Sequence, residues 1–248
     1  GKQLSSLLGL SAKLTESTKK YWSDFELDAS KRSPNEKKPA VYTFSGPAFK
    51  GIDVPTCSPE TLAYMQSNLR IIDPLYGALR PLDLIQPYRL EMASKDILSK
   101  SEIGSYKSLA SWWSESITTS IINDLEIECN NDKVVINLAS DEYSSAINSN
   151  NLSEKCRYMK IVFQQDGRVI AVHAKRARGL MVRYIAENNI TDAMSIHKFD
   201  LEGYEFVSSR SKSDLLVFDR AKNWSEKGKR KGKNDGNFSG KKKARKKN

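Results

Sequence analysis

Three arginines alternate with three carboxylates in one short part of the chain, residues 69–92. These charged residues are Arg70, Asp73, Arg80, Asp83, Arg89 and Glu91. A guanidinium group binds phosphate or carboxylate oxygens through paired N–H donors, so such a set either forms structural ion pairs or lines a cleft that binds an anion. The sequence leaves both alternatives open.

The same stretch contains Pro74, Pro81 and Pro87, which lack a backbone N–H donor and restrict the residues before them. A regular helix or a central strand therefore cannot run through it, and its apolar content argues against a solvated tail. We predict an ordered, packed loop, and ordered long loops are usually functional.

A second basic group, formed by Lys175, Arg176 and Arg178, lies at the expected start of a helix. Free backbone N–H groups and the positive end of the helix dipole favour a bound anion there, whereas basic side chains at that end are otherwise disfavoured. We therefore predict a phosphate-binding site, in which Gly179 lets a backbone approach closely. The alternative is a helix that simply begins with solvent-exposed basic residues.

Polar residues also follow the apolar run of residues 134–138, a common place for sites in α/β folds. Asp141 and Glu142 are the candidates for a general base or for ligands of a divalent cation. Alternatively, they stabilise the start of their own helix and pair with Arg80 or Arg178. Because no Ser/His/Asp order or Cys/His pair specifies a nucleophile, no catalytic residue is assigned.

The net charge of +10 lies at one end of the chain. Residues 222–248 hold twelve Lys or Arg against Glu226 and Asp235, which leaves 28 basic and 28 acidic residues in residues 1–221. Glycines among the lysines and a near absence of apolar residues predict a disordered tail. Such a tail binds DNA or RNA non-specifically, serves as a nuclear or nucleolar address, or only improves solubility.

Cysteine and histidine are scarce: Cys57, Cys129 and Cys156 form no CxxC pair, and only His173 and His197 accompany them. This pattern predicts neither a disulfide framework nor a metal site, and it does not support a peroxide-sensing thiol. Without a G-x-G-x-x-G or P-loop motif, no cofactor is predicted. No apolar run approaches the roughly 20 residues of a membrane span. We expect a cytoplasmic or nuclear protein, although a targeting segment upstream of residue 1 stays open.

The elements that position these groups follow from hydrophobic periodicity and capping signals. We expect helices over residues 4–22, from Ser58 or Thr61 to Asn68, and over 106–127 and 175–189. Strands are expected over residues 41–44, 69–72 and 134–138, with a hairpin of residues 157–163 and 168–173. The pattern predicts a mixed α/β or α+β fold, with one compact domain over residues 1–221 and a tail over 222–248.

Three separated motifs stand in order along the chain. They are LRIIDPLYGALRPLDLIQPYRLEM at residues 69–92, VVINLASDEY at 134–143 and AKRARGLMVRYIAEN at 174–188, with the weaker GYEF at 203–206 and LLVF at 215–218. Their order and spacing resemble those of the peroxide stress protein YaaA family over about residues 4–220. The resemblance implies a mixed sheet surrounded by helices, DNA binding through a positively lined cleft, and a role in the response to hydrogen peroxide. The family's N-terminal strand and Ser-Pro-Ala-Lys turn are absent here, so we expect a fragment.

Residues 4–22 resemble the family's helix-hairpin-helix-like region, with Thr15 to Thr18 where the turn of that motif wants glycine. Lys19 and Lys20 are phosphate-contact candidates there, and a solvated helix face is the alternative. The full predicted set of phosphate-contacting residues is Arg80, Arg89, Lys175, Arg176, Arg178, Lys19 and Lys20. The expected partner is DNA, with RNA as an alternative, and a monomer is assumed. Two rival functions stay open: an enzyme acting on a phosphorylated or nucleotide substrate, and an RNA- or ribosome-associated factor that uses the basic tail.

Overall fold

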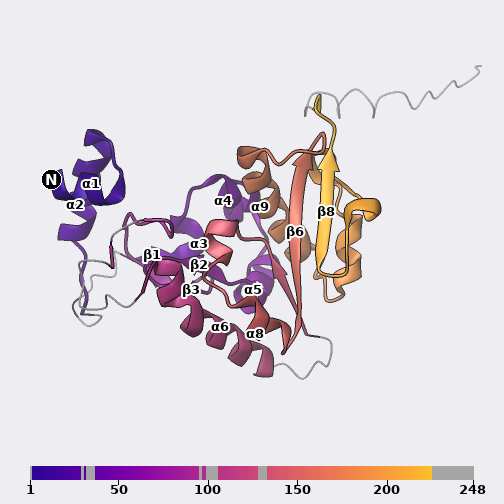
Figure 1. Ribbon diagram of the computed structural model, residues 1–248, viewed down its shortest axis with the longest axis horizontal. Coiled ribbons are helices and arrows are strands. Elements are labelled where there is room, and N and C mark those ends of the chain that lie inside the picture. The colour runs from indigo at the N-terminus through magenta and orange to yellow at the C-terminus, as the bar shows by residue number, and fades with distance from the viewer. Residues whose placement is uncertain are drawn as a thin grey trace, which may run out of the picture.

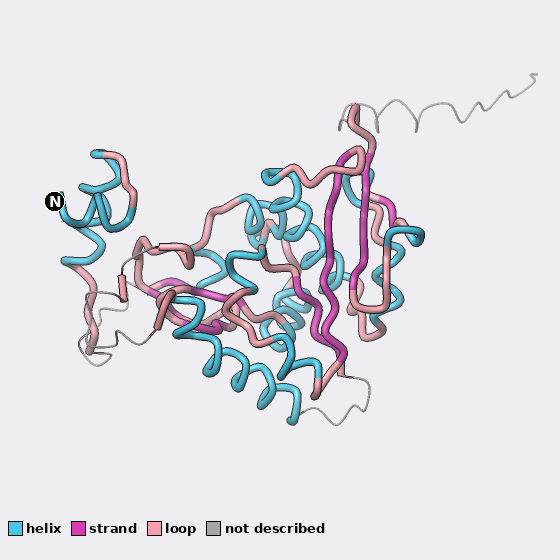
Figure 2. Tube along the Cα trace, viewed as in Figure 1, coloured by secondary structure: helices cyan, strands magenta, loops and turns pink. Residues whose placement is uncertain are grey.

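The computed structural model describes residues 2–28, 31, 37–94, 97–98, 106–127 and 133–224 (Figure 1). The helices are α1 (Lys2–Leu8), α2 (Ala12–Ser23), α3 (Ala40–Thr43), α4 (Pro47–Ile52), α5 (Pro59–Asn68), α6 (Leu109–Ile127), α7 (Asp141–Ser144), α8 (Ser149–Ser153) and α9 (Ala171–Glu187). The strands are β1 (Lys38–Pro39), β2 (Ile71–Asp73), β3 (Gly77–Leu79), β4 (Leu84–Ile85), β5 (Val134–Asn137), β6 (Arg157–Gln165), β7 (Glu205–Phe206) and β8 (Leu215–Arg220). Helices and strands are thus mixed along the chain, which confirms the predicted fold class (Figure 2).

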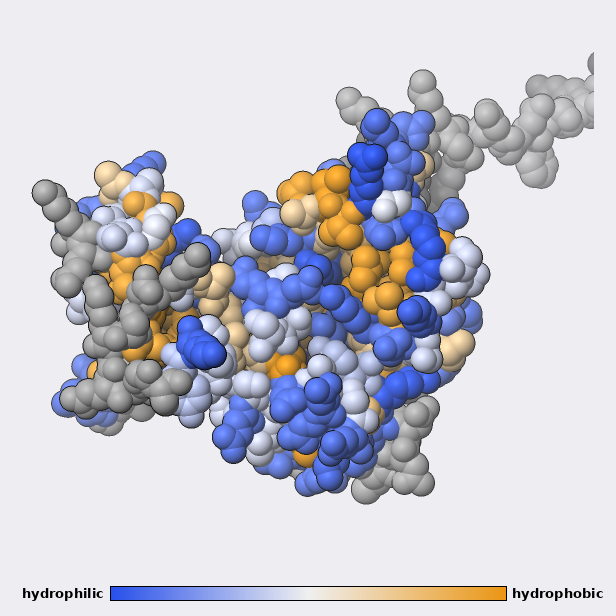
Figure 3. Space-filling view, in the orientation of Figure 1, coloured by the Kyte–Doolittle hydropathy of each residue, from blue (hydrophilic) through white to orange (hydrophobic). Residues whose placement is uncertain are grey.

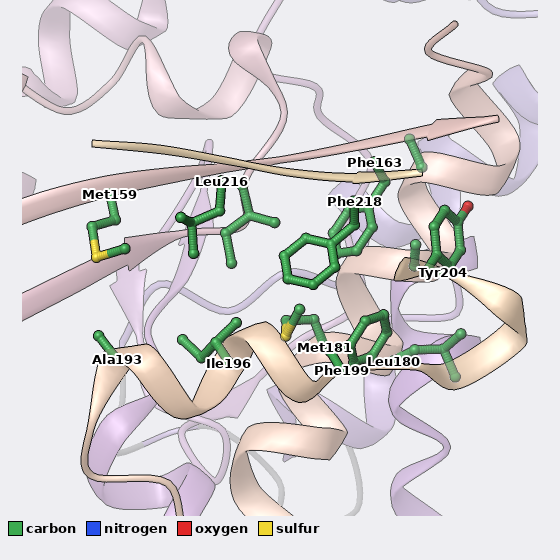
Figure 4. Close-up of a cluster of buried hydrophobic side chains, with 13 residues drawn as sticks. Met159, Phe163, Leu180, Met181, Ala193, Ile196, Phe199, Tyr204, Leu216 and Phe218 are labelled. Carbon is green, nitrogen blue, oxygen red and sulfur yellow. The ribbon is translucent and has the colours of Figure 1, made fainter. Parts of the chain in front are cut away.

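The largest sheet has the strand order β5–β6–β8–β7. Strands β5, β6 and β8 run parallel, and β7 pairs antiparallel to β8. Alternate residues of β6 are buried, because one face of the strand packs against α9 and the short 3-10 helices of residues 193–203. In Figure 4, Phe163 and Phe218 of the sheet point toward Met181 of α9 and toward Phe199. This cluster is the main core of the protein.

Helices α4 and α9 touch backbone to backbone through two glycines. A Cβ atom added at Gly179 of α9 would lie 1.8 Å from the carbonyl oxygen of Ala48, and one added at Gly51 of α4 would lie 2.4 Å from that of Arg176. Side chains at either position would therefore force the two helices apart. Gly179 permits close approach of a backbone, as its sequence position suggested, and that backbone belongs to α4.

The proline-containing stretch of residues 69–92 is ordered, as predicted, and no helix crosses it. It contains a tight hairpin of β2 and β3 that the sequence did not indicate. The hairpin turn is held by buried Asp73, whose carboxylate accepts hydrogen bonds from the backbone N–H groups of Leu75 and Tyr76 at 2.8 Å. The indole N–H of Trp113 on α6 donates to the carbonyl of Pro74 at 2.9 Å. Trp113 also packs against the apolar cluster around α6.

Two predicted strands are wrong. Residues 40–43 form the short helix α3, whose buried Ala40 and Val41 pack into two different apolar clusters. Residues 168–173 do not pair with β6 beyond one isolated bridge between Gln165 and Arg168. The physical reason is that β5 and β8 already occupy both edges of β6. The chain therefore leaves the sheet after the turn and begins α9 at Ala171, four residues earlier than expected.

The two N-terminal helices confirm the expected helical segment and lie as a lobe at one end of the molecule (Figure 1). Their connecting turn contains Gly9 at a φ of 61°. The lobe joins the rest of the chain through a reciprocal pair of hydrogen bonds, in which the backbone of Glu26 and the side-chain amide of Gln86 each donate to the other at 3.0 and 2.9 Å. The ring of Trp22 also lies 6.4 Å from that of Tyr88.

Two predictions concern residues outside the part of the chain that the structure describes. The disordered tail was predicted for residues 222–248, of which 225–248 lie outside the described residues, and Cys129 lies outside them as well. Among the residues that are described, none of the helices is both long and apolar enough to cross a bilayer.

Candidate functional site

Helix α7 follows β5 after a short connection, and polar and charged side chains from four parts of the chain meet around it. We call this group the α7 cluster. It consists of Arg89, Glu91, Asp141, Glu142, Tyr143, Lys160 and Arg178. The three sequence motifs at residues 69–92, 134–143 and 174–188 thus converge in space, with Lys160 of β6 added.

One side of α7 faces β6 and α9. The Nζ group of Lys160 donates to Oδ1 of Asp141 at 2.6 Å, although the Asp141 side chain is 84% exposed. The hydrogen bond and charge of Lys160 lower the pKa of the Asp141 carboxyl, and the charge of Arg178 adds to the effect. Asp141 is therefore an ionised acceptor at neutral pH, which makes it a weak general base.

Arg178 is half-buried on α9, and burial is the main cause that lowers the pKa of its guanidinium, partly offset by the charge of Asp141. Its Nε atom is buried and has no hydrogen-bond partner within the part of the chain that the structure describes. A buried donor without an acceptor is costly and commonly marks a place for a water or a ligand. Arg178 is thus a partly exposed residue that has a buried donor without an acceptor.

The other side of α7 contacts the proline-containing stretch. Oε1 of Glu142 accepts from the backbone N–H of Ala93 at 3.1 Å. Burial raises the pKa of the Tyr143 phenol to about 12, and the negative charges of Glu142, Glu91 and Asp73 add to the increase. Glu142 thus ties α7 to the stretch that ends at residue 92, a role closer to the structural alternative than to a catalytic base.

Arg89 repeats the feature seen in Arg178. One of its terminal nitrogens lies 3.4 Å from Glu91, a long and exposed ion pair. Its Nε atom is buried and, among the described residues, has no partner. Two arginines from separate motifs therefore each have a buried donor that the described chain leaves unsatisfied.

Arg80, in contrast, belongs to a structural ion pair. It donates to Asp124 of α6 at 2.8 Å, and Arg70 donates to the second oxygen of the same carboxylate at 2.6 Å. Hydrogen bonds and charge from Arg70 first and Arg80 second lower the pKa of the Asp124 carboxyl. For these two arginines the alternative of structural ion pairs is the one that the structure favours.

The predicted group of Lys175, Arg176 and Arg178 does not lie at a helix start. Because α9 begins at Ala171, all three are in its second turn and beyond, and the helix dipole argument does not apply to them. Arg176 and Arg178 are 200° apart at about 100° per residue. Arg176 accordingly points to the other side, where it donates to Glu202 at 2.6 Å. Exposed Lys175 lies three residues before Arg178 and shares its side.

Lys19 and Lys20 lie on α2, in the N-terminal lobe. Lys19 forms an exposed ion pair with Glu16 at 2.9 Å, and Lys20 is exposed in the last turn of the helix. The turn that joins α1 and α2 lies at residues 9–11, before the Thr15–Thr18 segment where the sequence argument placed it. For Lys19 the structure favours the alternative of a solvent-exposed helix face.

Two hollows in the described part of the chain are lined by other residues, although one of them includes Asp124, the partner of Arg70 and Arg80. An open apolar pocket of about 340 Å³ lies between α1, Trp22 and the start of α6, and a wider groove of about 740 Å³ runs along the exposed side of α6. Neither is lined by a predicted phosphate-contacting residue. In the described parts of the chain, no three His, Cys, Asp or Glu side chains gather as a metal site.

The surroundings of Cys57 and Cys156 do not favour a reaction of either thiol with peroxide. Cys57 and Cys156 are both half-buried and free, and burial is the main cause that raises the pKa of each thiol. A raised pKa reduces the thiolate fraction, and thiolate is the form that reacts with peroxide.

Sequence reasoning missed Lys160. The signal was its position as the charged residue within the otherwise apolar run 158–163 of β6, between buried Met159 and Ile161. A charged side chain inside a strand marks the face that does not belong to the core.

The protein thus has a mixed α/β fold with a cluster of basic and acidic side chains around α7. The chain belongs to the family of the peroxide stress protein YaaA, whose model matches residues 1–210. It is 38% identical over 218 residues to a UPF0246 protein of Polynucleobacter necessarius, which covers 86% of this chain and 80% of that one. It is also 38% identical over 222 residues to a UPF0246 protein of Francisella tularensis subsp. novicida, with 88% and 83% covered. A UPF0246 protein of Clostridium perfringens is 41% identical over 189 residues, with 75% and 71% covered.

Proposed function

We propose that this protein binds DNA in the cellular response to hydrogen peroxide, and that the α7 cluster contacts the phosphate backbone. The observation that carries the proposal is the pair of buried Nε donors on Arg89 and Arg178, which have no acceptor among the described residues. Membership in the peroxide stress protein family supports the physiological half of the proposal.

Phosphate suits these donors for two reasons. A guanidinium presents several N–H groups in a plane, so Nε and a terminal nitrogen can bind two oxygens of one phosphate. Half-buried arginine also interacts more strongly with an anion than a fully solvated lysine does, because less water screens the charge. Within the cluster three basic side chains accompany three carboxylates, and exposed Lys175, three residues before Arg178, adds the excess positive charge that attracts an anion over a longer range.

The proposed role predicts how charge removal changes the affinity. We expect Arg178→Gln to weaken duplex DNA binding to a similar degree on unrelated sequences, because phosphate contacts do not read the base order. The slope of log affinity against log salt should fall in magnitude by about 1. Arg157→Gln, at the exposed start of β6, removes the same charge outside the cluster and serves as the matched control.

Fluorescence anisotropy of a labelled duplex, titrated with the full chain at several salt concentrations, measures both quantities. Circular dichroism of each variant checks that the fold is retained. An Arg178→Gln protein that binds every duplex as tightly as the Arg157→Gln protein would contradict the role of the α7 cluster. The same titration with RNA duplexes and single strands tests the alternative of an RNA-associated factor.

An enzyme that acts on a phosphorylated or nucleotide substrate is the second candidate. The observation that favours it is the compactness of the Lys160–Asp141–Arg178 group, in which a carboxylate lies beside two cations. Such a group fits one small anion as well as a polymer. This candidate predicts that a nucleotide or sugar phosphate raises the melting temperature of the wild type, and that Asp141→Asn abolishes the shift while DNA affinity is unchanged.

A further inference from the structure

The turn between β6 and α9, together with the first turn of α9, exposes three aliphatic side chains in close succession. Val169 is 56% exposed, Ile170 40% and Val172 57%. In Figure 3 apolar side chains gather at the upper edge of the molecule, over the N-terminal end of α9. Single exposed aliphatic residues are ordinary, but three within four residues at a protruding turn are a local patch. We call these three residues the aliphatic tip.

The tip stands on a firmly held turn. Gly167 has a φ of 72°, and its backbone N–H donates to Oδ2 of Asp219 on β8 at 3.0 Å. The same carboxylate accepts from Arg210 at 2.5 Å. On the β6 side, the backbone N–H of Gln165 donates to the carbonyl of Arg168 at 2.8 Å. These bonds fix the turn to the sheet, so the exposed side chains are presented on a rigid support.

Cationic groups surround the tip. Arg168 and Lys175 are exposed on its two sides along the chain, and Arg210 lies at the same turn, against the carboxylates of Asp166 and Asp219. The chain also leaves the sheet beside this turn, since the side-chain amide of Gln165 donates to the carbonyl of Lys222 at 3.0 Å. Residues 225–248, which continue from there, contain eleven Lys or Arg. The aliphatic tip with basic residues near it is complementary to a nucleic acid, in which anionic phosphates flank the apolar faces of the bases.

We propose that the aliphatic tip inserts as a wedge between neighbouring base pairs of DNA. The inference rests on the proposed DNA binding and names a second, apolar contact for it. Minor-groove and architectural proteins insert Ile, Leu, Met, Phe or Pro between base steps, while nearby cations hold the backbone. Lys175 lies three residues after Val172 and shares the side of α9 that carries Arg178, so the wedge stands next to the proposed phosphate contacts.

A membrane surface is the other polyanion with an apolar interior. Helices that lie in a membrane interface combine a long amphipathic face with Trp, Phe or Leu. The tip instead has three β-branched aliphatic residues, two before α9 and Val172 in its first turn, and the inner face of this helix is already buried in the core. The geometry therefore favours a narrow insertion into stacked bases over a broad insertion into lipid.

The test uses a DNA duplex that contains 2-aminopurine, whose fluorescence rises when the base unstacks. The variant is the full chain with Val169→Thr, Ile170→Thr and Val172→Thr, which keeps β-branched side chains and the net charge. The matched control is Met194→Gln, because Met194 is a similarly exposed apolar residue at 55% and lies outside the tip. Since all these side chains are exposed, the changes should leave the fold intact, which circular dichroism checks.

We expect the wild type and the Met194→Gln protein to raise the 2-aminopurine fluorescence, and the triple variant to lose the increase. Its affinity should fall by about tenfold, or about 1.4 kcal/mol, with an unchanged salt slope because no charge is removed. A triple variant that behaves as wild type, while Arg178→Gln still weakens binding, would overturn the wedge and leave the proposed function standing. A wild type that binds no duplex overturns both.

Binding to lipid vesicles tests whether the tip inserts into a membrane instead of DNA. Wild-type binding to phosphatidylserine-containing vesicles that the triple variant loses, together with no change in 2-aminopurine fluorescence on DNA, would assign the tip to a membrane and overturn the wedge. No loss of vesicle binding in the triple variant, with the fluorescence change dependent on the tip, supports it.

Discussion

Replacing Gly179 by alanine tests the contact that positions α9. An alanine Cβ at this position would lie 1.8 Å from the carbonyl oxygen of Ala48 and 2.7 Å from its carbonyl carbon, and both atoms belong to the backbone of α4. Ordinary contacts of this kind are about 3.4–4 Å, so the two helices must separate by more than 1 Å or bend. Glycine to alanine in a helix would otherwise gain about 1 kcal/mol of helix propensity.

The cost of the steric clash exceeds the gain in helix propensity. Forcing extra atoms into a packed contact costs roughly 1–3 kcal/mol and more where backbone must move, so we expect a net loss of about 2 kcal/mol in the free energy of unfolding. For a domain of this size, that corresponds to a fall of roughly 4–8 °C in the melting temperature. Urea denaturation followed by circular dichroism measures the midpoint and the slope.

Gly46→Ala provides the matched control, because a Cβ atom there has no neighbour within 4 Å and its φ is −62°. As Gly46 is the N-cap of α4, the control should cost under about 1 kcal/mol. If Gly179→Ala unfolded at the same urea concentration as the control, the backbone contact between α4 and α9 would not hold, and the placement of Arg178 relative to the sheet would lose its basis.

Three further expectations follow from the ion pairs and from the chain end. Because the pKa of Asp124 is lowered in the folded state, its stabilising effect is present above the unfolded pKa of about 4 and is lost as pH falls below it. Asp124→Asn should cost roughly 0.5–1 kcal/mol at pH 7 and flatten the acid loss of stability in a series of melting curves; an unaltered acid profile would argue against the pair. Arg80→Gln should lower stability slightly and leave DNA affinity within about twofold by anisotropy, because Arg80 is engaged by Asp124. Ending the chain after Trp224 should reduce the salt slope of DNA binding without abolishing binding, and complete loss would assign the affinity to residues 225–248.

Sequence predicted elements well where the signal is local. Helix α5 begins as expected because the Ser58 hydroxyl accepts from the N–H of Thr61, and α6 follows from its apolar period. The strand β5 and the polar helix start after it were also predictable. These signals depend on a few neighbouring residues and need no knowledge of the rest of the fold.

Other features depend on distant partners. The apolar run before α9 predicted a strand, but β6 had no free edge to receive it. As a result α9 begins four residues earlier than predicted, and Lys175 does not lie at the start of the helix. Which arginines are paired could not be predicted either, because Asp124 and Glu202, the partners of Arg80 and Arg176, lie far away in the sequence.

The close contact between α4 and α9 also determines what binding costs. Since the two helices meet through their backbones, neither can rotate or slide without a clash, and Arg178 is carried on a surface that is rigid before any ligand arrives. The conformational entropy of placing its guanidinium was therefore lost largely during folding. A phosphate bound as proposed would meet a donor on a backbone that is already fixed, so more of the interaction energy would remain available as affinity.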